Sequence, residues 1–249
     1  MDLNADLGEG FGIWRLGDDQ ALLELITSAN VACGFHGGDP STMHRVCAAA
    51  AERGVAVGAQ VGYRDLAGFG RRHIAYDFAE LRDETIYQIG ALDAFCKLFR
   101  TRVCYVKPHG ALYHAAACDE AQAAALVAAV SSYDHELPLL CPPGSVLAQL
   151  AVGAGLRVIA EGFADRNYLP NGQLVSRTAA NALVTDPDAV ATRAVRMATE
   201  RTVVAVDGSV VPCQVESICL HGDSPGAVRS AELVRAALID AGVTLAPFA

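Results

Sequence analysis

The chain has 249 residues, of which 52% are hydrophobic and 19% are charged, so it can bury a large core. Its formal net charge is -9, and its longest basic run is only Arg71-Arg72, so nucleic acid is excluded as an expected partner. Single-domain barrels often reach this length, and we therefore expect one domain over residues 1–249.

The expected compartment follows from three further observations. The N-terminal stretch MDLNADLGEG is acidic and lacks the apolar region of a signal peptide. No stretch approaches the roughly 20 apolar residues that a membrane span needs. The eight cysteines form no C-x-x-C pair, which favours buried thiols over disulfides or a zinc cage. We expect a soluble, cytoplasmic protein that does not contact a membrane.

Short apolar runs alternate with amphipathic segments along the chain. Seven runs are predicted strands: Asp2–Asp6, Asn30–Phe35, Val55–Gln60, Val103–Lys107, Pro138–Cys141, Arg157–Glu161 and Ser217–Leu220. Continuous apolar strands separated by helices are typical of parallel strands that are buried on both faces. The pattern predicts an α/β fold, an irregular seven-stranded parallel (β/α) barrel that is TIM-barrel-like, with a doubly wound open sheet as the alternative.

Residues typical of helix ends support this alternation. Asp39 is placed to cap a helix that has Pro40 at its first position and Gly54 as its stop. Asp77 and Glu80 form a capping box ahead of a long amphipathic helix. Both helices therefore have defined starts in the sequence.

Three other segments carry local signals. The sequence VVAVDGSVVP, with its Asp207-Gly208 pair, predicts a β-hairpin before the final strand. Ser224 and Pro225 are expected to open the last helix. The segment 68–72, GFGRR, is either a lid with glycine hinges or a solvated loop.

Reactive side chains follow almost every predicted strand. In a (β/α) barrel the site is built at the carboxyl ends of the strands. The residues at those ends are Asp6, Glu9, His36, Asp39, Gln60, Lys107, His109, Cys141, Glu161, Asp165, Arg166, His221 and Asp223. A histidine followed by glycine occurs at three of these corners, which favours a functional site over three unrelated structural histidines.

Six blocks of the sequence also resemble one known family. DLNADLGEGFG, SANVACGFHGGDP, DLAGFGRR, VKPHGALY, FADRNY and SICLHGD are similar to motifs of the LamB/YcsF family and span residues 2 to 223. The resemblance implies a seven-stranded barrel of the glycoside hydrolase/deacetylase type. It also implies the A subunit of an ATP-hydrolysing 5-oxoprolinase, which opens the 5-oxoproline lactam to L-glutamate together with subunits B and C.

One corner departs from the family pattern. Where the family usually has Gly-Ala-His-Pro, this chain has Gly58-Ala59-Gln60-Val61. Gln60 can form hydrogen bonds, but it cannot act as a base or as an imidazole ligand.

The implied reaction needs a base for water, a proton donor for the ring nitrogen and cations for phosphoryl oxygens. Asp6 or Asp165 is the expected base. We expect Lys107 to stabilise negative charge and His109 to donate the proton. The residues expected to bind substrate are His36, Glu161, Arg166, Arg177, His221 and Asp223.

The same residues also have structural interpretations. The two arginines suit a substrate carboxylate, because a guanidinium matches it bidentately. Arg166 could instead pair only with Asp165, and Lys107 only with Glu161, as structural ion pairs. For Arg177 the two interpretations are even.

The cofactor expectations follow from what the sequence lacks. The resemblance implies ATP, with magnesium, as the cofactor. No G-x-x-x-x-G-K-[ST] motif occurs, so a P-loop of this chain is not expected to hold it. We expect no tightly bound transition metal, because Gln60 stands where the family offers another imidazole.

Two functions from other classes stay open. The first is a stand-alone metal-dependent amidase or deacetylase with Asp6, His36 and His221 as ligands. The second is a non-catalytic subunit that binds substrate while its partners carry out the ATP chemistry.

Overall fold

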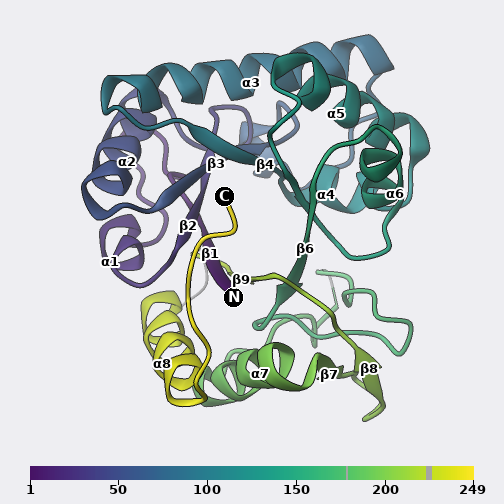
Figure 1. The fold of residues 1–249 in the computed structure, drawn as a ribbon. Helices are drawn as coiled ribbons and strands as arrows, with labels where there is room; N and C mark the ends of the chain where they lie inside the picture. Colours follow the sequence, from purple (N-terminus) through teal and green to yellow (C-terminus); the bar gives the residue numbers. More distant parts are fainter. Residues whose placement is uncertain (178, 223–225) are drawn as a thin grey trace.

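The computed structural model describes residues 1–177, 179–222 and 226–249. Parallel strands form a closed barrel in the order β1-β2-β3-β4-β5-β6-β9, with helices around it (Figure 1). The strands are β1 (Asp2–Leu7), β2 (Ser28–Ala32), β3 (Ala56–Val61), β4 (Val103–Pro108), β5 (Leu139–Cys141), β6 (Val158–Phe163) and β9 (Ser217–Leu220). The predicted seven-stranded barrel is confirmed. The open-sheet alternative is wrong, because β9 pairs with both β1 and β6.

The helices follow the strands as the sequence predicts. They are α1 (Asp19–Leu23), α2 (Pro40–Arg53), η1 (Leu66–Gly68), α3 (Phe78–Leu98), α4 (Gly110–Ala116), α5 (Glu120–Tyr133), α6 (Val146–Gly153), α7 (Pro187–Glu200) and α8 (Ala227–Asp240). The Asp39 side chain caps α2, and Gly54 ends it in the left-handed conformation. The Asp77 side chain accepts a hydrogen bond from the Glu80 N–H at the start of α3. The predicted opening of the last helix at Ser224 and Pro225 lies outside the described residues.

Two local predictions have different outcomes. The strands β7 (Thr202–Val204) and β8 (Val210–Pro212) form the predicted antiparallel hairpin between α7 and β9. The prediction that the second strand runs to Phe35 is wrong. The β2 strand ends at Ala32, because Gly34 has a φ of 92° and its N–H bonds to the Gly37 carbonyl oxygen at 2.9 Å.

The interior of the barrel is a column of polar side chains. The Asn30 Nδ2 atom donates to Asn4 Oδ1 at 2.6 Å and to Asp6 Oδ1 at 2.8 Å. The Asn4 amide in turn donates to Ser217 Oγ at 2.6 Å. The expectation of uniformly apolar strands therefore fails in β1. Its sequence DLNADL alternates, so that polar residues turn inward while the apolar residues belong to the hydrophobic core.

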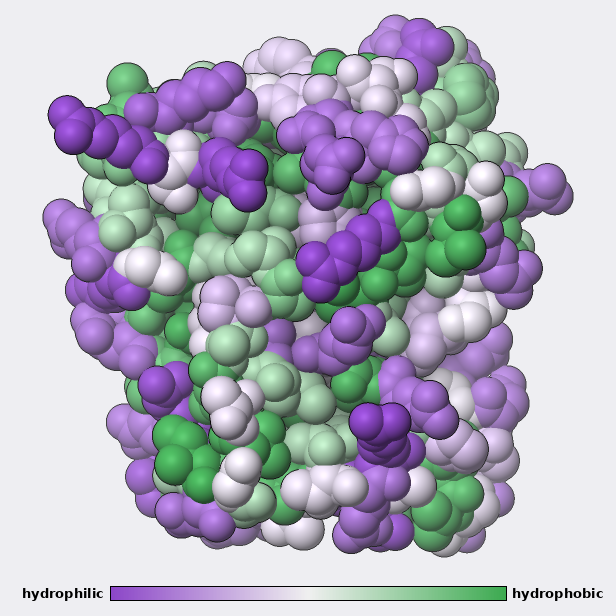
Figure 2. All heavy atoms as spheres, viewed as in Figure 1, coloured by the Kyte–Doolittle hydropathy of each residue, from purple (hydrophilic) through white to green (hydrophobic). Residues whose placement is uncertain are grey.

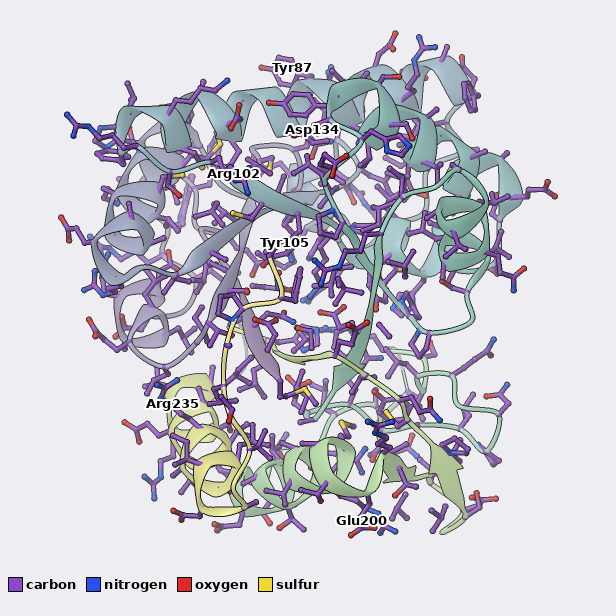
Figure 3. All side chains as sticks on the ribbon, viewed as in Figure 1. Tyr87, Arg102, Tyr105, Asp134, Glu200 and Arg235 are labelled. Carbon is purple, nitrogen blue, oxygen red and sulfur yellow. The ribbon has the colours of Figure 1, made fainter. Side chains whose placement is uncertain are left out.

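The C-terminal tail covers the amino end of the barrel. In Figure 3, Tyr105 lies beside this tail at the centre of the molecule, and its ring is 4.9 Å from that of Phe248. The Ala246 N–H also donates to the Met1 carbonyl oxygen at 3.1 Å. The Tyr105 ring requires glycine on the neighbouring strand β3, since a Cβ at Gly58 would lie 2.1 Å from it. The carboxyl end of the barrel is thus the open end.

The surface is mixed in character. On the face seen in Figure 2, hydrophilic side chains lie around the edge and also across the middle, with apolar ones between them. Among the described helices, none is both long and apolar enough to cross a membrane. All eight cysteines carry free thiols, and six of them are buried.

Candidate active site

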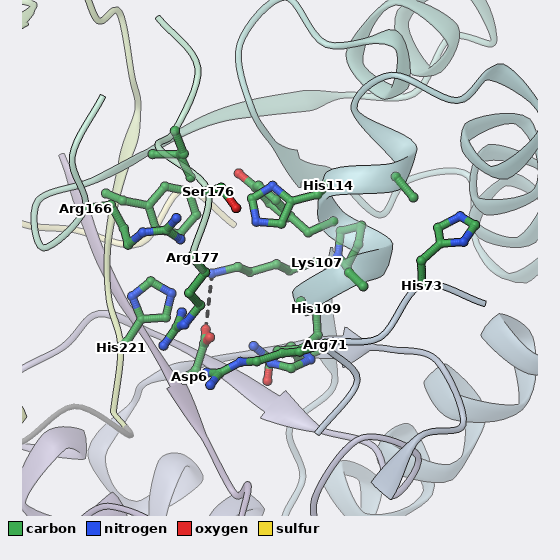
Figure 4. Close-up of a pocket in the computed structure, with 18 of the residues that line it drawn as sticks. Asp6, Arg71, His73, Lys107, His109, His114, Arg166, Ser176, Arg177 and His221 are labelled. Atoms are coloured by element: carbon green, nitrogen blue, oxygen red, sulfur yellow. Dashed lines mark hydrogen bonds and ion pairs between the residues drawn. The ribbon is translucent and has the colours of Figure 1, made fainter. Parts of the chain in front are cut away.

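A pocket of about 1050 Å³ opens at the carboxyl end of the barrel (Figure 4). Among the described residues that line it, four are cationic and one is a carboxylate: Arg71, Lys107, Arg166, Arg177 and Asp6. The chain as a whole has a net charge of -9, so this positive charge is concentrated locally. A pocket of this kind attracts anions.

Lys107, at the end of β4, forms the floor of the pocket. Its Nζ atom lies 3.2 Å from Asp6 Oδ1 and 2.7 Å from Glu161 Oε1, and the dashed line in Figure 4 marks the contact with Asp6. It also lies 3.1 Å from the Cys219 sulfur. The Lys107–Glu161 ion pair considered from the sequence therefore forms, and the same ammonium also holds Asp6.

Burial and charge act in opposite directions on these groups. Burial raises the pKa of Asp6, but the Lys107 ammonium, with smaller contributions from His221 and His109, brings it below its ordinary value. Burial lowers the pKa of Lys107, yet Asp6 and its other partners hold it well above the usual range. Burial also raises the pKa of Glu161, and Lys107 offsets only part of this. The floor therefore presents an ammonium and a carboxylate, both charged, at neutral pH.

His221 and Asp165 form a hydrogen-bonded pair at the wall. The Asp165 Oδ2 atom lies 2.8 Å from His221 Nδ1 and also accepts the His221 backbone N–H at 3.0 Å. The Phe163 ring stacks on the imidazole at 5.5 Å. Burial raises the pKa of Asp165, but the contacts with His221 lower it further than burial raises it. Because Nδ1 is engaged, Nε2 is the nitrogen that can serve a ligand of the pocket.

His36 and His109 stack on each other beside the floor. Their ring centroids are 3.7 Å apart at an interplanar angle of 12°, and the Phe69 ring meets both of them edge to face. Burial lowers the pKa of His36 to about 4. Burial, and then repulsion from His36, lower the pKa of His109 well below its ordinary value. Both imidazoles are therefore neutral at neutral pH.

Arg166 supports the loop that follows β6. Its Nη2 atom donates to the Val175 carbonyl oxygen at 2.7 Å, and its Nε atom donates to the Ala182 carbonyl oxygen at 3.4 Å. These contacts position the loop that carries Arg177 into the pocket lining. Figure 4 shows Arg166 and Arg177 together with Ser176 and His221 among the residues that line the pocket.

The structure separates the expected site residues into two groups. Asp6, Lys107, His109, Arg166, Arg177 and His221 line the pocket. His36, Glu161 and Asp165 lie buried behind its wall and contact the lining residues. Asp223, expected to bind substrate, lies outside the described residues.

Three further residues line the pocket, and the sequence related only Arg71, as part of the possible GFGRR lid, to a site. Arg71, His73 and His114 all line the pocket. Arg71 belongs to the GFGRR segment, whose Gly70 carbonyl oxygen accepts the Ala111 N–H at 2.8 Å, so this segment forms part of the wall. The glycines flanking Phe69 were a signal for this arrangement. His73 lies in a loop and His114 lies inside α4, so neither stands at a strand end and neither gave a signal.

Relatives with known names match the whole chain. A 5-oxoprolinase A subunit of Mycolicibacterium gilvum is 56% identical over 248 residues, covering 100% of this chain and 98% of the relative. A protein of the same name from Streptomyces avermitilis is 57% identical over 249 residues, covering 100% of each chain.

Solved structures agree with these matches. The lactam utilization protein from Thermus thermophilus superposes with a TM-score of 0.95 at 45% identity, covering 100% of this chain and 99% of that one. A family 4 carbohydrate esterase from Streptomyces lividans, at 11% identity and a TM-score of 0.51, shares the fold alone. The sequence profile of the LamB/YcsF family matches residues 1–249. The chain therefore belongs to the LamB/YcsF family.

Proposed function

We propose that this chain is the A subunit of an ATP-dependent 5-oxoprolinase and that it works with subunits B and C to open the 5-oxoproline lactam to L-glutamate. The observation that carries the proposal is the cationic pocket with the Asp6–Lys107 pair at its floor and the Asp165–His221 pair at its wall. The names of relatives at 56% and 57% identity support both the substrate and the place of the chain in such a complex.

The charges of the pocket suit this substrate. 5-Oxoproline is a small anion, and Arg177 and Arg166 lie where a carboxylate can be bound. Lys107 at the floor can stabilise negative charge that develops on the lactam oxygen. Substrate binding therefore uses a local group of cationic side chains in a chain whose net charge is -9.

A lactam carbonyl is a poor electrophile, and transfer of the γ-phosphoryl group of ATP to its oxygen activates it. We assign this transfer, with magnesium-bound ATP, to the complex with subunits B and C, because the sequence has no P-loop. Water then adds to the activated carbon, and the C–N bond breaks to give γ-glutamyl phosphate. A second water releases phosphate and L-glutamate, so two waters and one ATP are consumed.

His221 is the base that the geometry favours for the attack of water. With Nδ1 held by Asp165, Nε2 can accept a proton from water and return it to the ring nitrogen as that nitrogen leaves. This assigns to Asp165 the positioning of His221 rather than direct proton abstraction. It also leaves Asp6 to fix the Lys107 ammonium.

Glutamate formation from 5-oxoproline tests the proposal. We expect turnover and ADP release when the chain is combined with subunits B and C, and neither with the chain alone. Turnover by the lone chain without ATP would instead favour a stand-alone amidase. Undiminished turnover of a complex that carries Lys107→Ala, with only its affinity changed, would favour the non-catalytic binding subunit.

A further inference from the structure

A second cluster of side chains lies beside the pocket floor. It joins three loops that follow different strands: Glu9 after β1, His36 after β2 and His109 after β4. All three residues are buried, and one ligand atom from each lies within 4.8 Å of the other two. We propose that Glu9, His36 and His109 bind one divalent transition-metal ion of the zinc class. This inference does not depend on the function proposed above.

The distances in the cluster fit ligands around a shared ion. The Glu9 Oε1 atom lies 3.8 Å from His36 Nε2 and 3.5 Å from His109 Nε2. These separations are too long for a charge-assisted hydrogen bond, which brings the two atoms to about 2.7–2.9 Å. Two ligand atoms that are each about 2.1 Å from a tetrahedral ion lie about 3.4 Å apart. The spacing therefore matches coordination better than direct pairing.

One histidine nitrogen gives independent support for a bound ion, because it has no hydrogen-bond partner in the described part of the chain. His36 has no exposed surface, and its Nε2 atom makes no hydrogen bond with any residue that the structure describes. His109 Nδ1 is also unpaired among the described residues, but it faces Gly70, and Nε2 is the His109 nitrogen that lies near Glu9. Buried polar atoms nearly always have a partner. A bound cation would supply the partner of this imidazole nitrogen beside the carboxylate.

Glycines hold the two rings in place. A Cβ at Gly70 would lie 2.6 Å from the His36 Cβ and 2.9 Å from His109 Nδ1. A Cβ at Gly62 would lie 2.6 Å from His36 Nδ1. The backbone therefore closes on the rings from two loops, and Phe69 covers both of their edges. The two imidazoles are therefore held side by side next to Glu9.

The ligand set indicates the class of ion. Two imidazoles and one carboxylate suit zinc and related first-row ions, and such a set leaves a coordination position for water. His109 and Gln60 also line the pocket, which gives an ion a route of entry. Because each nitrogen lone pair lies in its ring plane, binding would splay the stacked rings.

The sequence led to different expectations about whether a metal binds and about which residues would be its ligands. The sequence favoured no tightly bound transition metal, and its alternative ligand set was Asp6, His36 and His221. In the structure His221 is held by Asp165, and Asp6 is held by Lys107 and Asn30. One experiment can distinguish the two ligand sets and the absence of metal.

The full chain is stripped with chelator, dialysed against Zn²⁺ or Co²⁺, passed through a desalting column and assayed for metal content. We expect about one ion per chain for the wild type, with a Co²⁺ visible spectrum of imidazole ligation and a raised Tm. Glu9→Gln, which keeps the side-chain shape, should lose the ion while its metal-free Tm stays near that of the wild type. His36→Asn should also lose it.

Two variants serve as matched controls. His221→Asn should keep the ion, since His221 belongs only to the alternative ligand set. His135→Ala should also keep it, because this exposed histidine could bind metal only at the surface. Failure of the wild type to retain metal would overturn the proposal. The proposal would also be overturned if the Glu9→Gln variant kept the metal ion, or if the His221→Asn variant lost it.

Discussion

The Nδ1 atom of His221 lies 2.8 Å from Oδ2 of Asp165, and the same oxygen accepts the His221 backbone N–H. One carboxylate oxygen thus fixes both the main chain and the ring of the histidine. In this arrangement Nδ1 carries the proton and Nε2 carries the lone pair. The pair has the geometry of a base and the group that orients it.

His221→Asn should lower kcat of the assembled complex by about 10²- to 10⁴-fold, the range for loss of a general base. Glutamate release under saturating 5-oxoproline and ATP measures the effect. Asp165→Asn should also lower kcat, because the amide can stabilise the His221 tautomer whose proton is on Nε2, which cannot accept a proton from water. His135→Ala is the control and should match the wild type. A His221→Asn complex with full activity would remove His221 from the mechanism.

Lys107→Met should destabilise the fold by about 3–5 kcal/mol, because it leaves Asp6 and Glu161 as buried carboxylates without their shared cation. Urea unfolding followed by circular dichroism measures the change. Adding Asp6→Asn and Glu161→Gln to Lys107→Met should recover much of the loss, and a fully stable single variant would contradict the argument.

Gly58→Ala should lower the stability of the fold more than most substitutions of one small residue for another. Its Cβ would lie 2.1 Å from the Tyr105 ring, and overpacking of a tight core typically costs about 1–3 kcal/mol or more. The Tm of the variant measures the cost. Tyr105→Leu combined with Gly58→Ala should be less destabilised than the sum of the two single changes. Strict additivity would show that the two residues do not compete for space.

Asp165 should contribute to acid sensitivity. Its contacts with His221 lower its pKa in the folded state, whereas an unfolded aspartate has a pKa of about 3.9. The unfolded chain therefore binds the proton first, so this contribution is complete above about pH 5 and is lost as pH falls through the folded pKa. Asp165→Asn should be less stable than the wild type at pH 7. The difference between them should shrink between about pH 5 and pH 3 in urea titrations, and a constant difference would contradict the linkage.

Much of the fold was readable because local signals agreed with one another. The capping residue Asp39, the stop at Gly54 and the Asp207-Gly208 turn all appear where the sequence placed them. The polar interior was also present in the alternation of DLNADL, but the apolar character of the other strands obscured it. The end of β2 was misplaced because an apolar run does not reveal a positive φ at Gly34.

The sequence could predict only those site residues that lie at the carboxyl ends of strands. His109 and His221 lie in the pocket lining, as the rule for parallel barrels predicts. The approach of Glu9 to His36 depends on close contact between two loops, where a Cβ at Gly37 would lie 2.9 Å from the Glu9 carbonyl oxygen. No periodicity or spacing encodes such a contact between segments distant in sequence.

The polar column inside the barrel also determines how the strands align. Side chains alternate along a strand, so a slip of β1 by one residue would turn Leu3 and Ala5 into the network and expel Asn4 toward the helices. Each displaced polar group would then be buried without its partner. An apolar interior would tolerate such a slip far better. The buried polar residues that serve the pocket thus also select one pairing of the strands during folding and disfavour the shifted alternatives.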